Sequence, residues 1–182
     1  MEAAPFHNEA AEGPAGGAGY WLITEDKVRI RIGVWPLPGA KGTVLIFPGR
    51  TEYAEKYGRA ARDLHDRGYA AISIEWRGQG LADRFLADRR LGHVGQFRHY
   101  QRDVRAVLGA LVNLDLPRPW HLIGHSMGGC IGLRALYEEL PVAGAVFSAP
   151  MWGVQMSAPM RPVAWVLSSI LPPMGFSEQR SP

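Results

Sequence analysis

The sequence has one cysteine, Cys130, among its 182 residues. A single cysteine excludes an internal disulfide and any zinc site built from several thiolates. Blocks of like charge are also absent, because the formal net charge is only +3 and the arginines are scattered among acidic residues. A nucleic-acid-binding surface needs clustered positive charge, so we expect no nucleic-acid partner.

Long apolar runs are missing as well. No stretch reaches the ~20 consecutive apolar residues that a membrane-spanning helix needs. The N-terminal residues have neither the early positive charge nor the hydrophobic stretch of a secretory signal. We therefore expect a cytoplasmic location. No spacing of His, Asp and Glu suggests a metal site, so we expect no bound metal.

The composition is that of a globular domain. Hydrophobic residues make up 47% of the chain and charged residues 20%, and this length suits one domain with a sizeable core rather than two. Residues 1–19 are rich in Ala, Gly, Pro and Glu and contain no apolar run. This composition predicts a disordered tail over residues 1–19.

Short apolar segments alternate with helical patterns over the rest of the chain. Two β-rich segments, 20–24 and 28–35, predict an antiparallel hairpin. Continuous apolar runs predict four further strands, at 43–47, 70–74, 120–123 and 142–147. Apolar residues at helical spacing predict helices at 57–64, 97–111 and 131–136. This order predicts an α/β fold with a mostly parallel sheet, whose ligand crevice lies at the carboxyl ends of the strands.

The stretch around Ser126 carries the chemistry. Gly124, Ser126 and Gly128 match G-x-S-x-G, and they lie where an apolar run ends and a helical pattern begins. At such a strand-to-helix corner the serine hydroxyl stands clear of the backbone, and only very small side chains fit two residues before and after it. Free amides at the start of the helix point to the same place, where they can hold a developing oxyanion. The pattern predicts a nucleophilic serine.

Four stretches stand out in order and spacing: 47–53 (FPGRTEY), 77–82 (RGQGLA), 124–129 (GHSMGG) and 148–150 (SAP). Together they resemble the α/β-hydrolases of the monoacylglycerol lipase and lysophospholipase group, over about residues 20–155. The resemblance implies an α/β-hydrolase fold, Ser126 as the nucleophile and no cofactor. It also implies an oxyanion hole made by the main-chain N–H groups of Arg50 and Met127. Pro48 stands where the family often has His, which changes the polar contacts of this loop but not its main-chain donors.

The acid and base of the family's triad are not found after Ser126. In this family an Asp and then a His follow a cap, but no histidine follows Ser126 here, and the only later acids are Glu138, Glu139 and Glu178. We therefore expect the sequence to be the N-terminal part of a longer hydrolase. Residues 20–150 would form the hydrolase core and residues 151–182 the beginning of a helical cap.

The resemblance implies a serine hydrolase acting on carboxylic esters, with a lysophospholipid or a monoacylglycerol as substrate. A catalytically incomplete fragment, or a non-catalytic binding scaffold of the same fold, is the alternative. Dehalogenases and epoxide hydrolases on this fold use a carboxylate nucleophile, and Ser126 argues against that chemistry.

Several residues near these motifs have two interpretations. His125 is next to the nucleophile, but neighbours on a sharp turn point in different directions, so we do not expect it to be the base. We expect Arg77 and Asp83 to anchor the loop beside the site rather than to clamp substrate. The Met- and Trp-rich segment 151–176 could line an acyl pocket, could contact the inner face of the membrane, or could simply cover the core as a packed helix.

Overall fold

A computed structural model describes residues 1–153 and 157–170 of the chain. The chain divides into two compact units, Met1–Met151 and Trp152–Pro182. Within the second unit the structure describes one helix, α5 (Met160–Ile170), whose side chains are almost all exposed. None of the helices in the described ranges has the length and apolar character required to cross a bilayer.

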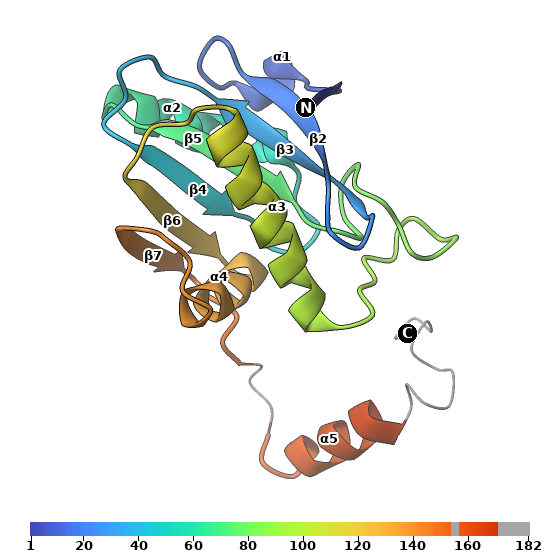
Figure 1. Ribbon diagram of the computed structural model, residues 1–182. Coiled ribbons are helices and arrows are strands. Elements are labelled where there is room, and N and C mark those ends of the chain that lie inside the picture. Colours follow the sequence, from blue (N-terminus) through green and yellow to red (C-terminus); the bar gives the residue numbers. More distant parts are fainter. Residues whose placement is uncertain (154–156, 171–182) are drawn as a thin grey trace. The chain divides into compact units, whose positions relative to one another are not determined.

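The first unit is built on a seven-stranded mixed sheet with the strand order β1-β2-β3-β5-β4-β6-β7 (Figure 1). Its strands are β1 (Glu2–Ala4), β2 (Ala18–Ile23), β3 (Arg29–Trp35), β4 (Thr43–Phe47), β5 (Ala70–Glu75), β6 (Trp120–His125) and β7 (Gly144–Ser148). The β2–β3 hairpin and the β3–β5 pair are antiparallel, whereas β5, β4, β6 and β7 pair in parallel. The predicted α/β-hydrolase fold, with an antiparallel N-terminal hairpin beside a parallel core, is confirmed.

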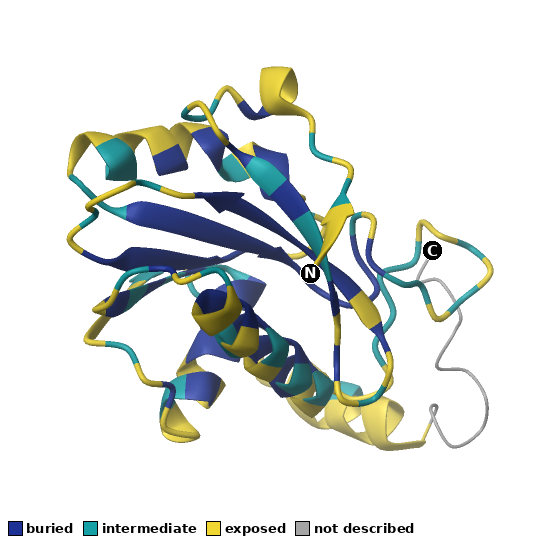
Figure 2. Ribbon diagram, turned by 45° about the horizontal axis from the view of Figure 1, so that its top comes forward, coloured by how far each residue is buried: buried dark blue, intermediate teal, exposed yellow. Residues whose placement is uncertain are grey.

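Helices cover both faces of this sheet. Helix α2 (Gly58–Asp66) lies on one face, preceded by the 3-10 turn η1 (Ala54–Tyr57). Helices α3 (Tyr100–Asn113) and α4 (Met127–Tyr137) lie on the other, with the 3-10 turn η2 (Phe97–His99) leading into α3. The central strands between them are buried, as Figure 2 shows, which is why their sequences read as continuous apolar runs.

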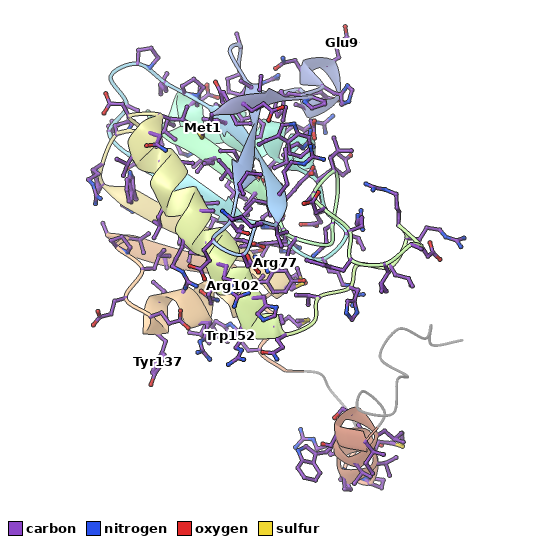
Figure 3. The ribbon with its side chains drawn as sticks, turned by 45° about the vertical axis from the view of Figure 1, so that its right-hand side comes forward. Met1, Glu9, Arg77, Arg102, Tyr137 and Trp152 are labelled. Atoms are coloured by element: carbon purple, nitrogen blue, oxygen red, sulfur yellow. The ribbon has the colours of Figure 1, made fainter. Side chains whose placement is uncertain are left out.

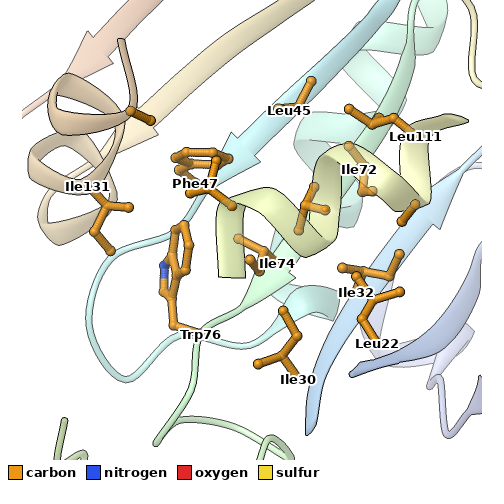
Figure 4. Packing of buried hydrophobic residues seen from close by; sticks show 14 of the residues in the cluster. Leu22, Ile30, Ile32, Leu45, Phe47, Ile72, Ile74, Trp76, Leu111 and Ile131 are labelled. Carbon is orange, nitrogen blue, oxygen red and sulfur yellow. The ribbon is translucent and has the colours of Figure 1, made fainter. Parts of the chain in front are cut away.

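The core is divided by the sheet into two clusters because side chains alternate along each strand. The larger cluster joins α3 and α4 to the sheet, and Figure 4 shows Leu45, Phe47 and Ile72 in its centre. The rings of Phe47 and Trp76 meet edge to face with their centres 5.0 Å apart. The smaller cluster lies under α2 and includes Val44 and Ile46, the neighbours of Leu45 and Phe47 that point the other way.

The predicted disordered tail over residues 1–19 is wrong. Strand β1 pairs with β2, and a short helix, α1 (Asn8–Ala11), follows it. The segment is fixed by contacts with residues far along the chain: the Pro5 carbonyl accepts a hydrogen bond from Arg31 at 2.5 Å, and the Phe6 ring packs against Trp35. Composition could not indicate this order, because it comes from partners outside the segment.

Candidate active site

Ser126 lies at the corner between β6 and α4, with φ 49° and ψ −118°. Positive φ is uncommon for a residue with a side chain and costs about 1–3 kcal/mol, so the surrounding structure must hold it in place. Its backbone is held on both sides. The Ser126 N–H donates to the Ser148 carbonyl at 3.1 Å, and the Ser126 carbonyl accepts from the Met151 N–H at 2.9 Å.

The two glycines of the motif lie where the surrounding backbone leaves little room, or none, for a side chain. A Cβ added to Gly128 would lie 2.0 Å from the Phe47 carbonyl oxygen, and one added to Gly124 would lie 3.0 Å from the Cα of Gly129. These close approaches bring the start of α4 against the ends of β4 and β6. The geometry is the physical reason for the spacing seen in the sequence.

The loop after β4 faces the serine. A Cβ added to Gly49 would lie 3.2 Å from the Cβ of Ser126. The N–H of Gly49 donates to a Glu52 carboxylate oxygen at 2.6 Å, and the N–H of Thr51 donates to the side-chain carbonyl of Gln79. The amides on either side of Arg50 are therefore occupied.

The main-chain N–H groups of Arg50 and Met127, near Ser126, have no acceptor among the described residues. Met127 begins α4, so its N–H belongs to the free amides at the positive end of the helix dipole. These are the two donors that the resemblance assigns to the oxyanion hole. Their role stays a prediction.

Glu52 is the residue that ties this loop together. Its carboxylate accepts hydrogen bonds from Gly49 and from the Tyr57 hydroxyl, at 2.6 and 2.5 Å, and pairs with Lys56. Burial alone would raise the pKa of Glu52, but the bonds from Lys56, Tyr57 and Gly49 outweigh it and lower that pKa below its ordinary value. Burial and the Glu52 charge together raise the pKa of Tyr57 well above its ordinary value.

His125 is positioned by backbone rather than by the nucleophile. Its Nδ1 lies 3.1 Å from the Ser148 carbonyl, and its Nε2 lies 3.9 Å from Glu52. A carbonyl can only accept, so Nδ1 carries the proton in this arrangement. Within the described residues no hydrogen bond reaches the Ser126 hydroxyl, from His125 or from any other side chain.

Arg77 anchors the loop after β5, as expected. Its guanidinium binds Asp103 at 2.8 Å and Asp26 at 2.8 and 3.0 Å. Arg102 also binds Asp26, at 2.6 Å, and Figure 3 shows Arg77 and Arg102 close together at the start of α3. Asp83 has the second anchoring role, because its carboxylate accepts from the Arg29 N–H at 2.8 Å.

A second buried ion cluster supports the same edge of the sheet. Arg31 pairs with Glu55 at 2.7 Å and with Glu75, and all three side chains are buried. Glu75 also accepts hydrogen bonds from the main-chain N–H groups of Ala54 and Leu81, at 3.1 and 2.8 Å. One carboxylate thus links the loops that follow β4 and β5.

Sequence reasoning missed Glu52, Gln79 and this cluster. The one available signal was a charged residue, Glu75, directly after the apolar run of β5. The part of the chain that the structure describes contains no group of three or more His, Cys, Asp or Glu side chains arranged to hold a metal ion.

Comparison with known proteins gives the family context. Residues 38–182 match the sequence profile of a hydrolase family described as serine aminopeptidase, S33. Lysophospholipase L2 of Escherichia coli K12 is 39% identical over 120 residues, which cover 64% of this chain and 34% of that protein. A monoacylglycerol lipase of Mycolicibacterium smegmatis is 30% identical over 105 residues, covering 57% of this chain and 36% of that protein. The chain therefore spans about a third of the length of the curated relatives it matches.

Solved structures agree on the fold. A soluble variant of the monoglyceride lipase of Saccharomyces cerevisiae, in complex with a substrate analogue, superposes with a TM-score of 0.66. The superposition covers 93% of this chain and 55% of that one, at 22% identity. The Pyrococcus furiosus esterase Pf2001 superposes with a TM-score of 0.64 over 97% of this chain and 68% of that one, at 20% identity. At these identities the likeness shows the fold alone.

Proposed function

The chain belongs to the serine aminopeptidase S33 family of α/β-hydrolases, and on that premise we propose that it hydrolyses carboxylic esters of lipids, a lysophospholipid or a monoacylglycerol, with Ser126 as the nucleophile. One observation carries the proposal. Ser126 stands at a strand-to-helix corner with positive φ, beside the unoccupied N–H groups of Arg50 and Met127.

The reaction follows from that arrangement. The Ser126 Oγ attacks the acyl carbonyl carbon, and the carbonyl oxygen takes up the displaced electron pair. The N–H groups of Arg50 and Met127 donate to this oxyanion, and each such donor is worth about 3 kcal/mol in serine hydrolases. Collapse of the intermediate expels the alcohol and leaves an acyl-enzyme, which water then hydrolyses to the fatty acid.

The hydroxyl proton must pass to a base. Within the described residues no imidazole or carboxylate is hydrogen-bonded to the Ser126 hydroxyl. In α/β-hydrolases the base is a histidine that comes later in the chain than the serine. Without a base the serine hydroxyl is a weak nucleophile, so we expect this 182-residue chain to react slowly.

An activated-serine probe tests the assignment. We expect a fluorophosphonate to label the chain slowly and at Ser126, as read by intact mass and peptide mapping, and we expect Ser126→Ala to abolish that labelling. Ser168→Ala is the matched control, because Ser168 is exposed on α5, and it should label like the wild type. Equal labelling of Ser126→Ala and the wild type would exclude Ser126 as the nucleophile. Rapid labelling would mean that the chain already supplies a base, and His125→Gln would then identify it.

The second candidate is a scaffold of the same fold that binds lipid esters without cleaving them. It is favoured by the observation that, within the described residues, no side chain is hydrogen-bonded to the Ser126 hydroxyl. Lysolipid binding that is unaffected by Ser126→Ala, together with no labelling at all, would support this alternative.

We also propose a cytoplasmic location with contact to the inner face of the membrane. Its support is the apolar surface of α5, where Trp165, Val166 and Leu167 are exposed.

A further inference from the structure

A cavity of about 250 Å³ opens between the loop after β4 and the loop after β5. Thr51 and Glu52 line it on one side, and Arg84, Arg89 and Arg90 line it on the other. Thr51 directly follows Arg50, whose N–H is the proposed oxyanion donor. The cavity is therefore next to the reacting centre.

The three arginines differ in their partners. No carboxylate of the described residues forms an ion pair with Arg84 or Arg89, whereas Arg90 is paired with Asp88 at 3.0 Å. The Nη atoms of Arg84 donate to the carbonyls of Gly78 and Gly80, at 2.5 and 2.8 Å, which orients its guanidinium. Its Nε is buried without an acceptor among the described residues.

Three arginines line this cavity, against one carboxylate, that of Glu52. Burial, together with repulsion from Arg89, lowers the pKa of Arg84, although the negative charge of Glu75 raises it. The carboxylates nearby are already engaged, Glu75 by Arg31 and Glu52 by Lys56. A bound anion would relieve this repulsion and supply acceptors. The planar fork of an arginine fits two oxygens of a phosphate group.

We propose that this cavity binds the phosphate of the substrate's head group, so that the protein prefers lysophospholipids to monoacylglycerols. The inference rests on the proposed function, because it takes Ser126 as the site of ester cleavage. The geometry suits one molecule that spans both sites. Thr51 is two residues from Gly49, so their Cα atoms lie at most about 7 Å apart. A glycerol unit separates ester from phosphate in a lysophospholipid, whereas the uncharged head group of a monoacylglycerol cannot form an ion pair with these arginines.

Binding to the Ser126→Ala protein tests the proposal without turnover. The probes are a short-chain lysophosphatidylcholine, a monoacylglycerol with the same acyl chain, sn-glycerol 3-phosphate and inorganic phosphate, each titrated calorimetrically. Arg89→Ala is the principal variant, because its side chain is exposed and its loss should not affect folding. Arg84→Gln is the second. Arg67→Ala is the control, an exposed arginine at the end of α2, which leads to the amino end of β5 rather than its carboxyl end.

We expect Arg89→Ala and Arg84→Gln each to weaken binding of the lysophosphatidylcholine by about tenfold or more, as for hydrogen bonds to a charged group. Monoacylglycerol binding should stay within about twofold, and Arg67→Ala should change neither lipid. Competition between the lysophosphatidylcholine and sn-glycerol 3-phosphate would support the head-group assignment.

Two results would overturn the proposal. One is an equal loss, or no loss, for both lipids in Arg89→Ala. The other is that the arginine variants weaken binding of inorganic phosphate but leave binding of the lysophosphatidylcholine unchanged, which would indicate a site for a free anion. Because these measurements use Ser126→Ala, they remain valid even if labelling shows that Ser126 is not the nucleophile. The two proposals can therefore fail separately.

Discussion

Ser126 keeps an unfavourable backbone conformation because its neighbours leave it no alternative. Its N–H donates to Ser148 at the end of β7, and its carbonyl accepts from Met151 in the segment that follows. Glu52 acts on the opposite side of the site, where it holds the Gly49 amide and leaves that of Arg50 free. Placement of a single main-chain donor thus depends on one carboxylate.

We expect Glu52→Ala to lower the free energy of unfolding by about 1–3 kcal/mol, because the Gly49 N–H and the Tyr57 hydroxyl lose a charged acceptor. It should also slow fluorophosphonate labelling of Ser126, since the loop after β4, which carries the proposed donor N–H of Arg50, is no longer fixed. Glu52→Gln keeps an acceptor oxygen and should recover part of both effects. The control is Glu9→Ala, an exposed residue on α1 (Figure 3).

The pH dependence has a definite sign. The pKa of Glu52 is lowered in the folded state, so its contribution to stability is present above its ordinary value of 4.5 and is lost as the pH falls through the lower folded value. Urea denaturation of wild type and Glu52→Ala should therefore converge in acid. A difference in stability that is constant from pH 7 to pH 3 would contradict this role.

At the scale of elements, local pattern predicted the strands well. The apolar run at 43–47 coincides with β4, and the runs at 70–74 and 120–123 differ from β5 and β6 only at their carboxyl ends. β4 and β5 are buried throughout and most of their residues are apolar, so their boundaries were visible. In β6, buried residues alternate with partly exposed ones. The turn at Ser126 was equally visible, because its glycine spacing lies within one short stretch of sequence, although the contact that excludes a side chain at Gly128 comes from Phe47.

Features that depend on distant partners could not be predicted. Arg31 pairs with Glu55 and Glu75, which are 24 and 44 positions away, and nothing in the sequence around Arg31 indicates those partners. The N-terminal segment is similar, because β1 forms only when β2 is beside it. Glu52 and Gln79 are ordinary loop residues by type. Their function comes from the amides that the fold brings to them.

The buried ion pair between Arg77 and Asp103, a residue of α3, gives a prediction at this scale. Asp103 is fully buried on α3, and burial raises the pKa of its carboxyl to about 6, although Arg77 lowers it. A folded-state pKa above the ordinary 3.8 means that the folded state takes up this proton first. The contribution of Asp103 to stability is then full below about pH 4 and is lost as the pH rises to about 6.

Asp103→Asn removes this dependence. Over the same interval we expect the variant to gain stability relative to the wild type by at most about 3 kcal/mol, from the size of the shift. Urea denaturation between pH 4 and pH 7 measures the difference. Asp63→Asn, an exposed position on α2, should run parallel to the wild type. Parallel curves for Asp103→Asn as well would mean that Arg77 keeps the carboxyl ionised.

At the scale of the whole first unit, the sheet brings the chemistry together. The loops after β4 and β5 and the turn after β6 all lie at the carboxyl ends of the parallel strands, where an open α/β sheet binds its ligand. Ser126, the proposed oxyanion donors and the basic cavity therefore lie at the same edge of the sheet although they are far apart in sequence. Arg31, Glu75 and Arg77 connect these loops from beneath, so the site is supported by buried charge as well as by apolar packing.

The same sheet leaves one edge open among the described residues. Strand β7 pairs with β6 on one side, and most of its side chains are exposed, with Val146 64% accessible. An apolar edge with unpaired main-chain groups can pair with another chain, whereas a lysine on the edge opposes such pairing.

We expect the chain to self-associate with increasing concentration in size-exclusion chromatography with light scattering, and Val146→Lys to shift it toward the monomer. Tyr137→Lys replaces an even more exposed side chain, 85% accessible, away from the edge on α4, and should leave the association unchanged. If both substitutions reduce self-association equally, surface charge rather than strand pairing governs it. If the wild type is monomeric at every concentration, the β7 edge does not pair with another chain.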